Sequence, residues 1–394
     1  MGQTVGLLMN TQFLLICTAN LSLFLVLSTW SFLPLFIVEI GGDSADAGLV
    51  MGSMGVTSLG SLPFISPLID RYGRKGFIIG GALLVGISNA GFLLFSSYSP
   101  LMVAVRLIKG VGFAACFNGC STAVVDLVSP EQRDQGIGLF GASSSLAVAF
   151  GPYWGERILL WWGFDYYFLL LIGYGLIGTC AALLLREPER TVGLHEARGF
   201  FPTAIRDRYV SMMALAAAFG AGFAAMNVFL PLYAKTLGLH SGMFFVAYCL
   251  SLLVIRLFLG HLLDRIRRET LIWACLLGFG VMLWMTSKVY LVVHTILLGI
   301  VFGALQGIAY PAMMARMVDR SRDHNRGIVV GLFTGSFGAG LNASVLVWGW
   351  VAEMKGLPSM YISAAAAMFL CAAVSLGVNL VRRNGGNRGT ISRP

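Results

Sequence analysis

The sequence predicts an all-α membrane protein with twelve transmembrane helices in two pseudo-symmetric six-helix bundles. The first observation behind this prediction is composition, because 57% of the 394 residues are hydrophobic and only 11% are charged. Soluble globular domains carry about 25% charged residues. The second and third observations are a set of twelve long apolar segments and a repeat that relates the first six to the last six. A water-soluble fold is therefore excluded, and an aromatic content of 12% also excludes disorder.

Each apolar segment is long enough to cross roughly 30 Å of hydrocarbon. Lipid-facing backbone must satisfy its own hydrogen bonds, so each segment is predicted to be a helix. The segments are also too long for the strands of a membrane barrel. The predicted spans are residues 12–40, 47–68, 77–96, 101–124, 136–158, 166–185, 210–235, 242–263, 270–287, 291–317, 328–351 and 359–381.

The basic residues predict the orientation. Most of the 27 Lys and Arg residues lie in the loops of one side, and such loops are typically cytoplasmic. Both termini are then cytoplasmic, and the net charge of +9 reflects topology instead of a nucleic-acid partner. The short loops and termini favour the bacterial inner membrane as the location.

The two halves of the chain repeat each other in order. The matching pieces are F-L-P-L-F at 32–36 with F-L-P-L-Y at 229–233, L-I-D-R at 68–71 with L-L-D-R at 262–265, V-D at 125–126 with V-D at 318–319, and G-L-F at 138–140 with G-L-F at 331–333. The spacing between partners is nearly constant, which indicates a duplicated six-helix unit. We predict an N-terminal bundle over 1–185, a cytoplasmic linker over 186–209, and a C-terminal bundle with a short basic tail over 210–394.

A charged loop between spans 2 and 3 reads Asp70-Arg71-Tyr72-Gly73-Arg74-Lys75. Its bases can pair with a carboxylate at the end of a neighbouring helix, and Asp126 and Asp319 end spans 4 and 10. Simple anchoring of the loop by positive charge is the alternative. The predicted gating residues, including the repeat of this loop in the second half, are Asp70, Arg71, Gly73, Arg74, Asp126, Asp264, Arg265 and Asp319.

Two six-helix repeats and a loop of the form D-R-x-G-R-K resemble the major facilitator superfamily of transporters, and more closely its twelve-span antiporter and efflux branch. The resemblance covers the whole chain. It implies alternating access, with the charged loop latching the two halves together on the cytoplasmic side. The chain departs from the family pattern at Ser66, where the family has Gly, and at Arg267, which replaces a Gly of the second-half loop.

Span 4 contains Arg106-Leu107-Ile108-Lys109-Gly110-Val111-Gly112, which resembles the family pattern R-x-x-Q-G-x-G with Lys109 in place of Gln. A charge within a span is costly unless it faces protein or water, so it is a functional candidate; a snorkelling side chain is the alternative. Other polar residues within spans are either solute contacts or helix–helix hydrogen bonds. The predicted substrate-binding residues are Arg106, Lys109, Asn20, Asn227, Arg256, Gln306 and Tyr310.

Span 5 carries Gly151, Pro152 and Gly155, which partly match an antiporter signature of the family. Ala147 and Glu156 replace two of its glycines. Small residues allow close helix approach and proline bends a helix, so these residues are predicted to act in helix packing. They favour export over import, although packing alone would also explain them.

The middle third of every span lacks Asp and Glu. Proton transfer along a membrane pathway normally uses a carboxylate or His, and the available candidates are Glu39, Glu156 and His294. The in-span cations therefore have no in-span carboxylate to neutralise them. Because an uncompensated buried charge is unfavourable, this pattern favours an anionic or zwitterionic solute.

We therefore predict a secondary transporter that exports a small organic solute by alternating access, with the proton gradient as its energy source and no cofactor. The alternative is import of an organic anion by proton symport or facilitated diffusion, and a non-transporting sensor is a third possibility. The sequence lacks the paired nucleophile and base, metal-ligand spacing or phosphate-binding loop that an enzyme or ATP-driven pump needs. The expected partners are the solute and the lipid bilayer, with the chain acting as a monomer without nucleic acid or metal.

Overall fold

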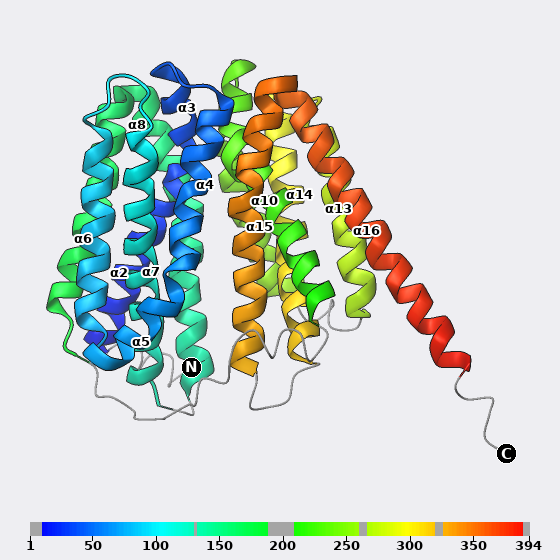
Figure 1. The fold of residues 1–394 in the computed structure, drawn as a ribbon, viewed down its shortest axis with the longest axis horizontal. Helices are drawn as coiled ribbons and strands as arrows, with labels where there is room; N and C mark the ends of the chain where they lie inside the picture. Colours follow the sequence, from blue (N-terminus) through cyan, green and yellow to red (C-terminus); the bar gives the residue numbers. More distant parts are fainter. Residues whose placement is uncertain (1–9, 130–131, 188–208, 260–265, 320–325, 389–394) are drawn as a thin grey trace. The chain divides into compact units, whose positions relative to one another are not determined.

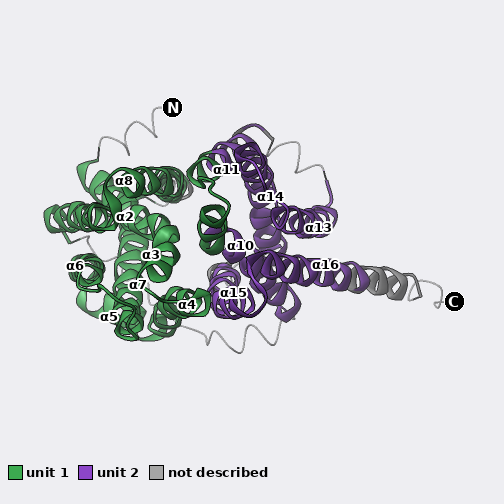
Figure 2. Cartoon of the chain, turned by 90° about the horizontal axis from the view of Figure 1, so that it is seen from above, with its two compact units in different colours: residues 1–196, 228–246 green, residues 197–227, 247–394 purple. Residues whose placement is uncertain are grey.

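The computed structural model describes residues 10–129, 132–187, 209–259, 266–319 and 326–388, and every regular element in these ranges is helical (Figure 1). The chain divides into two compact units, coloured separately in Figure 2. Unit 1 comprises Met1–Glu196 and Val228–Val246, and unit 2 comprises Ala197–Asn227 and Ala247–Pro394. Most of the predicted linker over 186–209 lies outside the described residues, so the predicted domain limits stay predictions.

The first half of the chain forms a bundle in which α2 packs on α8, α6 on α7 and α8, and α4 on α7. Its elements are α2 (Thr11–Thr29), the 3₁₀ turn η1 (Trp30–Phe32), α3 (Leu33–Glu39), α4 (Ser44–Gly60), α5 (Leu62–Tyr72), α6 (Lys75–Phe92), α7 (Leu101–Leu127) and α8 (Arg133–Leu184).

In the second half, α13 packs on α14 and α16, and α15 packs on α14 and α16. The elements are α10 (Val210–Thr236), α11 (Gly242–Val254), the π-helical turn η3 (Ile255–Leu259), α13 (Arg268–Thr286), α14 (Val292–Val318), α15 (Arg326–Lys355) and α16 (Leu357–Arg388).

The helices fit the predicted spans. Among the described residues, nine helices are long and apolar enough to cross a membrane, or ten if the bent pair α4 and α5 is one span. The shorter apolar helix α11 falls in the predicted span 242–263, of which 260–263 lie outside the described residues. Helix α8 carries two predicted spans, separated at Gly163, whose φ of 83° is readily adopted only by glycine. The all-α membrane fold is therefore confirmed.

The predicted span 47–68 is not one continuous helix. It is broken into α4 and α5, which are bent by 49° relative to each other. Pro63 lies in the first turn of α5 and lacks the amide hydrogen that would continue the helical hydrogen-bond pattern across the break. The bend places the charged loop, which begins at Asp70, at the end of a separate short helix.

Two close helix crossings recur in the two halves. Gly110 of α7 lies against the backbone of α4 at Met54, and Gly303 of α14 lies against the backbone of α11 at Tyr248. Beside Gly110, the Thr57 hydroxyl donates to the Leu107 carbonyl at 2.7 Å. Beside Gly303, the Ser251 hydroxyl donates to the Ile300 carbonyl, also at 2.7 Å. The duplicated sequence therefore repeats its packing in atomic detail.

Candidate functional site

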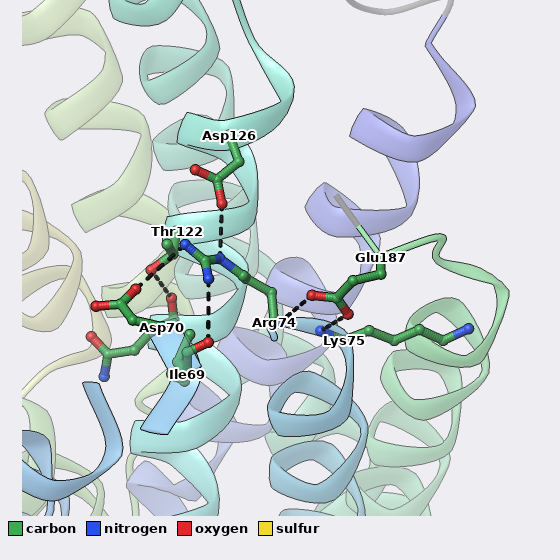
Figure 3. Close-up of polar contacts among 8 residues, drawn as sticks. Ile69, Asp70, Arg74, Lys75, Thr122, Asp126 and Glu187 are labelled. Carbon is green, nitrogen blue, oxygen red and sulfur yellow. Dashed lines mark hydrogen bonds and ion pairs between the residues drawn. The ribbon is translucent and has the colours of Figure 1, made fainter. Parts of the chain in front are cut away.

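The charged loop is organised around the guanidinium of Arg74 (Figure 3). Its Nε donates to Asp126 Oδ2 at 2.8 Å, its Nη1 donates to the Ile69 carbonyl at 3.2 Å, and its Nη2 lies 3.4 Å from Asp70 Oδ1. The side chains of Arg74 and Asp126 are 8% and 6% exposed, whereas that of Asp70 is 70% exposed. The ion pair expected between this loop and the end of span 4 is therefore present and largely buried.

Glu187 completes this cluster from the far end of α8. Its carboxylate accepts the backbone N–H groups of Arg74 at 2.5 Å and Lys75 at 3.0 Å, at the N-terminus of α6. Such a position is favourable for a negative charge. Gly73 has a φ of 102°, and a side chain there would collide with the Glu187 carboxylate. The loop therefore needs glycine for both backbone conformation and space.

The second half carries an equivalent ion pair. Arg268, which matches Arg74 in the repeat, pairs with Asp319, which matches Asp126. Here the side chains are 43% and 59% exposed. A second pair joins Arg316 Nη2 to Glu269 Oε1 at 3.0 Å.

Each of these pairs lies within one half, and the expected latch between the halves stays a prediction. Arg74 and Asp126 both belong to the first half, and Arg268 and Asp319 both belong to the second. The reason is that loop 2–3 and the end of span 4 come from neighbouring helices of the same bundle. Of the other gating candidates, Arg71 is exposed, with its Cζ 5.3 Å from the Tyr72 ring centroid, and Asp264 and Arg265 lie outside the described residues.

The two cations of span 4 lie around one tryptophan. Arg106 Cζ is 4.8 Å and Lys109 Nζ 3.4 Å from the ring centroid of Trp30. Arg106 and Lys109 are 3% and 1% exposed, respectively. Neither forms an ion pair within the described part of the chain. Their charge is offset only by dipoles and by the π face of the ring.

Asn89 of α6 connects these groups. Its Oδ1 accepts from Lys109 Nζ at 2.8 Å and from Trp30 Nε1 at 3.2 Å, while its Nδ2 donates to the Leu171 carbonyl at 3.1 Å. Arg106 instead reaches α4, where Nε and Nη2 donate to the carbonyls of Val50 and Met51, both at 3.2 Å. Arg106 Nη1 is buried and has no hydrogen-bond partner among the described residues.

Two predicted substrate contacts make hydrogen bonds to the protein. The Nδ2 of Asn20 donates to the Phe140 carbonyl and to Ser143 and Ser144 of α8, at 3.3, 2.8 and 2.7 Å. Asn227 donates to the Phe223 carbonyl of its own helix at 3.3 Å. Asn20 therefore links α2 to α8 by hydrogen bonds, which is the alternative to a solute contact given above for in-span polar residues.

The remaining predicted contacts, Gln306, Tyr310 and Arg256, all belong to unit 2. Gln306 is buried with its Oε1 unpartnered in the described part of the structure. One turn later, the Tyr310 ring lies 4.9 Å from Phe333 and 5.4 Å from Phe337. Arg256 is exposed on the π-helical turn η3, a type of distortion that is frequent at functional sites.

The residues of the antiporter-like signature lie where α8 crosses α2. A side chain at Gly151 would collide with Ser28, and one at Gly155 would collide with Thr29. Pro152 lies inside α8 between them. In the same region Ser28 Oγ donates to the Ala147 carbonyl at 2.9 Å.

The three candidates for proton transfer lie apart from Arg106 and Lys109 in sequence and have their own partners. Glu39 pairs with Lys235 at 3.0 Å, and Glu156 accepts the backbone N–H groups of Ser241 and Gly242 at 2.6 and 2.7 Å. His294 Nδ1 accepts the Tyr290 N–H at 3.4 Å. Within the described residues, no group of three or more His, Cys, Asp or Glu side chains could hold a metal.

Sequence reasoning missed several residues of both clusters. Glu187, Trp30 and Asn89 lie far in sequence from the motifs they support, so no local pattern marks them. Arg268 and Glu269 could have been found, because aligning the second half with the first places them opposite Arg74 and Lys75.

The fold is that of a helical integral membrane protein whose two halves repeat each other. A family model described as the Major Facilitator Superfamily matches residues 13–247 and 239–392. The chain belongs to the Major Facilitator Superfamily, whose members and structural neighbours are transporters, not enzymes.

Individual proteins agree with this assignment. An uncharacterised transporter of the superfamily from Methanocaldococcus jannaschii is 23% identical over 84% of this chain and 88% of its own length. A chloramphenicol resistance protein from Pseudomonas aeruginosa is 27% identical over 41% of this chain and 39% of its own length. The crystal structure of the nucleoside transporter NupG has a TM-score of 0.78 and 15% identity, covering 94% of this chain and 99% of that one. The similarity to NupG is one of fold alone.

Proposed function

We propose that this transporter exports a small organic solute that is anionic or zwitterionic, in exchange for protons. The observation that carries the proposal is the pair of buried cations, Arg106 and Lys109, which have no carboxylate partner among the described residues. A charge at the centre of a span costs at least about 2.5–3.5 kcal/mol by insertion scales. A negatively charged solute group would offset that cost in the loaded transporter.

The contacts of the two cations support this role. A cation–π interaction contributes about 2 kcal/mol when desolvated, so sharing Trp30 compensates each charge only in part. Asn89 supplies Lys109 with a single hydrogen bond, and Arg106 Nη1 has a donor to spare in the described structure. A carboxylate would accept such a donor strongly, because charge-assisted hydrogen bonds are about twice as strong as neutral ones.

Export is supported by the similarity to a chloramphenicol resistance protein, because removing a compound from the cell is one way to confer resistance. Alternating access then requires the charged loops to change between two states. The Arg74–Asp126 and Arg268–Asp319 pairs are the parts that we propose act as gates, each within its own half. Proton-coupled import of an organic anion is the alternative, since a solute that carries its own proton needs no carboxylate in the protein.

Transport by reconstituted vesicles distinguishes these directions. The probe is naphthalene-2-sulfonate, an aromatic anion whose charge does not change between pH 6 and 8, with the membrane voltage clamped by potassium and valinomycin. Proton exchange predicts accumulation in the acidic compartment and proton symport predicts accumulation in the alkaline one, whichever way the protein is inserted. Insensitivity to the pH gradient would indicate facilitated diffusion, and no flux of this or any other solute tested would indicate a sensor.

Variants test the cation pair. We expect Arg106→Gln and Lys109→Gln each to lower anion transport at least about tenfold, because each removes a charge that the solute would neutralise. Lys288→Gln is the matched control: Lys288 also lies over a tryptophan, 4.4 Å from the Trp284 ring centroid, but it is exposed. Thermal unfolding of each variant separates a lost site from a lost fold. Unchanged transport of every anion tested by both variants would contradict the proposal.

A further inference from the structure

Helix α14 carries a stripe of three side chains in unit 2. Phe302, Gln306 and Tyr310 are four residues apart, so they lie on one face of the helix in successive turns. Gln306 is the polar member, and it has an aromatic residue one turn before it and another one turn after it.

Rings from two further helices connect the ends of this stripe. The ring centroid of Phe223 on α10 lies 5.3 Å from that of Phe302 and 5.6 Å from that of Phe337 on α15. The Phe337 centroid in turn lies 5.4 Å from that of Tyr310. A continuous run of four rings therefore begins one turn before Gln306 and ends one turn after it. We call this set of Phe223, Phe302, Tyr310 and Phe337 the aromatic cage.

The amide of Gln306, which lies on α14 between Phe302 and Tyr310, is incompletely satisfied. The residue is 6% exposed, and its Oε1 has no hydrogen-bond partner among the described residues. A buried acceptor without a donor is unfavourable, and nearly all such groups in proteins find a partner. Neither the Tyr310 hydroxyl nor any other described group donates to this oxygen, so a bound molecule would supply the missing N–H or O–H.

Part of the cage is accessible. Phe302 is buried, but Phe223, Tyr310 and Phe337 are only half-buried. Aromatic rings bind one another favourably in offset or edge-to-face arrangements. Arg256 is exposed on η3, which packs against α14, so unit 2 offers a positive charge to an anionic end of the molecule.

We propose that unit 2 binds a planar aromatic acid whose N–H or O–H group donates to Gln306 Oε1 while its ring packs on the aromatic cage. The inference rests on the proposed function in that the bound acid is taken to be a transported solute. It adds the substrate class and a second contact region to the buried cations of unit 1.

Two probes that differ by one donor test this site. Indole-3-acetate and 1-methylindole-3-acetate have the same ring system and the same charge, but only the first has an N–H. Isothermal titration calorimetry on the purified full-length protein measures the dissociation constant Kd of each. We expect indole-3-acetate to bind about tenfold more tightly, because only it satisfies the buried acceptor.

The variant Gln306→Leu removes the acceptor and should bring the ratio of the two Kd values close to one. The matched control is Asn342→Leu, which also removes an in-span amide of unit 2, but one whose Nδ2 donates to its own helix at Gly338, at 2.8 Å. This control should keep the tenfold preference. Equal binding of the two probes by the wild-type protein, a preference that survives Gln306→Leu, or no binding of either probe would each overturn the inference.

The outcome is separable from that of the proposed function. Proton-driven transport of naphthalene-2-sulfonate with no preference between the indole probes would leave export standing and remove the aromatic-acid site. The reverse result, N–H-dependent binding without flux of any solute, would keep the site and reject the transport direction and coupling. In both cases the thermal unfolding of Gln306→Leu is measured, so that loss of the fold is not mistaken for loss of the site.

Discussion

The helices α7 and α14 occupy equivalent places in the two repeats, yet their interiors differ. Both are crossed closely at a glycine, Gly110 or Gly303, and both end next to an aspartate that pairs with an arginine. Just before the glycine, α7 carries Arg106 and Lys109, whereas repeat spacing puts Gly299 and Phe302 at the matching positions of α14. The first half buries two cations there, and the second buries the ring of Phe302.

This difference separates two kinds of constraint. Helix crossings and end pairs are needed by each bundle for its own packing, so both copies retain them. Interior side chains that meet a solute are free to diverge after duplication, because the two halves need not make the same contacts. The retained features should therefore respond alike to substitution in both halves, except where their burial differs.

The largest expected difference concerns the two arginine–aspartate ion pairs at the helix ends, Arg74–Asp126 and Arg268–Asp319. Asp126→Ala removes the buried ion-pair partner of Arg74 and leaves only the exposed Asp70 beside it, and we expect a loss of about 3–5 kcal/mol in the free energy of unfolding. Asp319→Ala breaks the exposed pair of the second half and should cost at most about 1 kcal/mol. Denaturant unfolding in detergent micelles measures both. Equal losses would show that the two pairs do not differ in burial as the structure describes.

The glycine crossings should respond alike. Gly110→Ala and Gly303→Ala each place a methyl group against a backbone carbonyl, of Met54 and Tyr248 respectively, and overpacking of this kind costs about 1–3 kcal/mol. Gly80→Ala is the control, since a side chain there meets nothing within 4 Å. Thermal unfolding midpoints give the comparison. A variant pair in which only one half is destabilised would break the equivalence of the crossings.

The smallest effect is expected at the hydroxyls beside these glycines. Thr57→Val and Ser251→Ala each remove one hydrogen bond between helices, which contributes about 0.6 kcal/mol in membrane proteins. Thr18→Val is the control because the Thr18 hydroxyl donates to Leu14 of its own helix. Unfolding measurements on several protein preparations are needed to resolve changes of this size. Losses above 2 kcal/mol in either half would show that more than one hydrogen bond is involved.

The candidate site was predictable where the signal is local or repeated. The D-R-Y-G-R-K loop predicted a carboxylate partner, and the structure pairs Arg74 with Asp126. The same reasoning failed to find Glu187, because an acidic residue at the end of α8 has no feature that marks it as the cap of α6. It offered both Asp126 and Asp319 as partners of the loop, since sequence spacing does not reveal which helix ends are neighbours.

The sequence by itself determined the membrane-embedded helical fold, the duplication and the family, because length, hydropathy and repeated motifs are properties of the chain read in order. Only the tertiary structure decided which distant side chains share a charge or a ring. Trp30, Asn89 and Lys109 come from three different helices, and the rings of the aromatic cage also come from three. Helix packing brings such residues together, and the packing depends on contacts across the whole bundle that no local pattern contains.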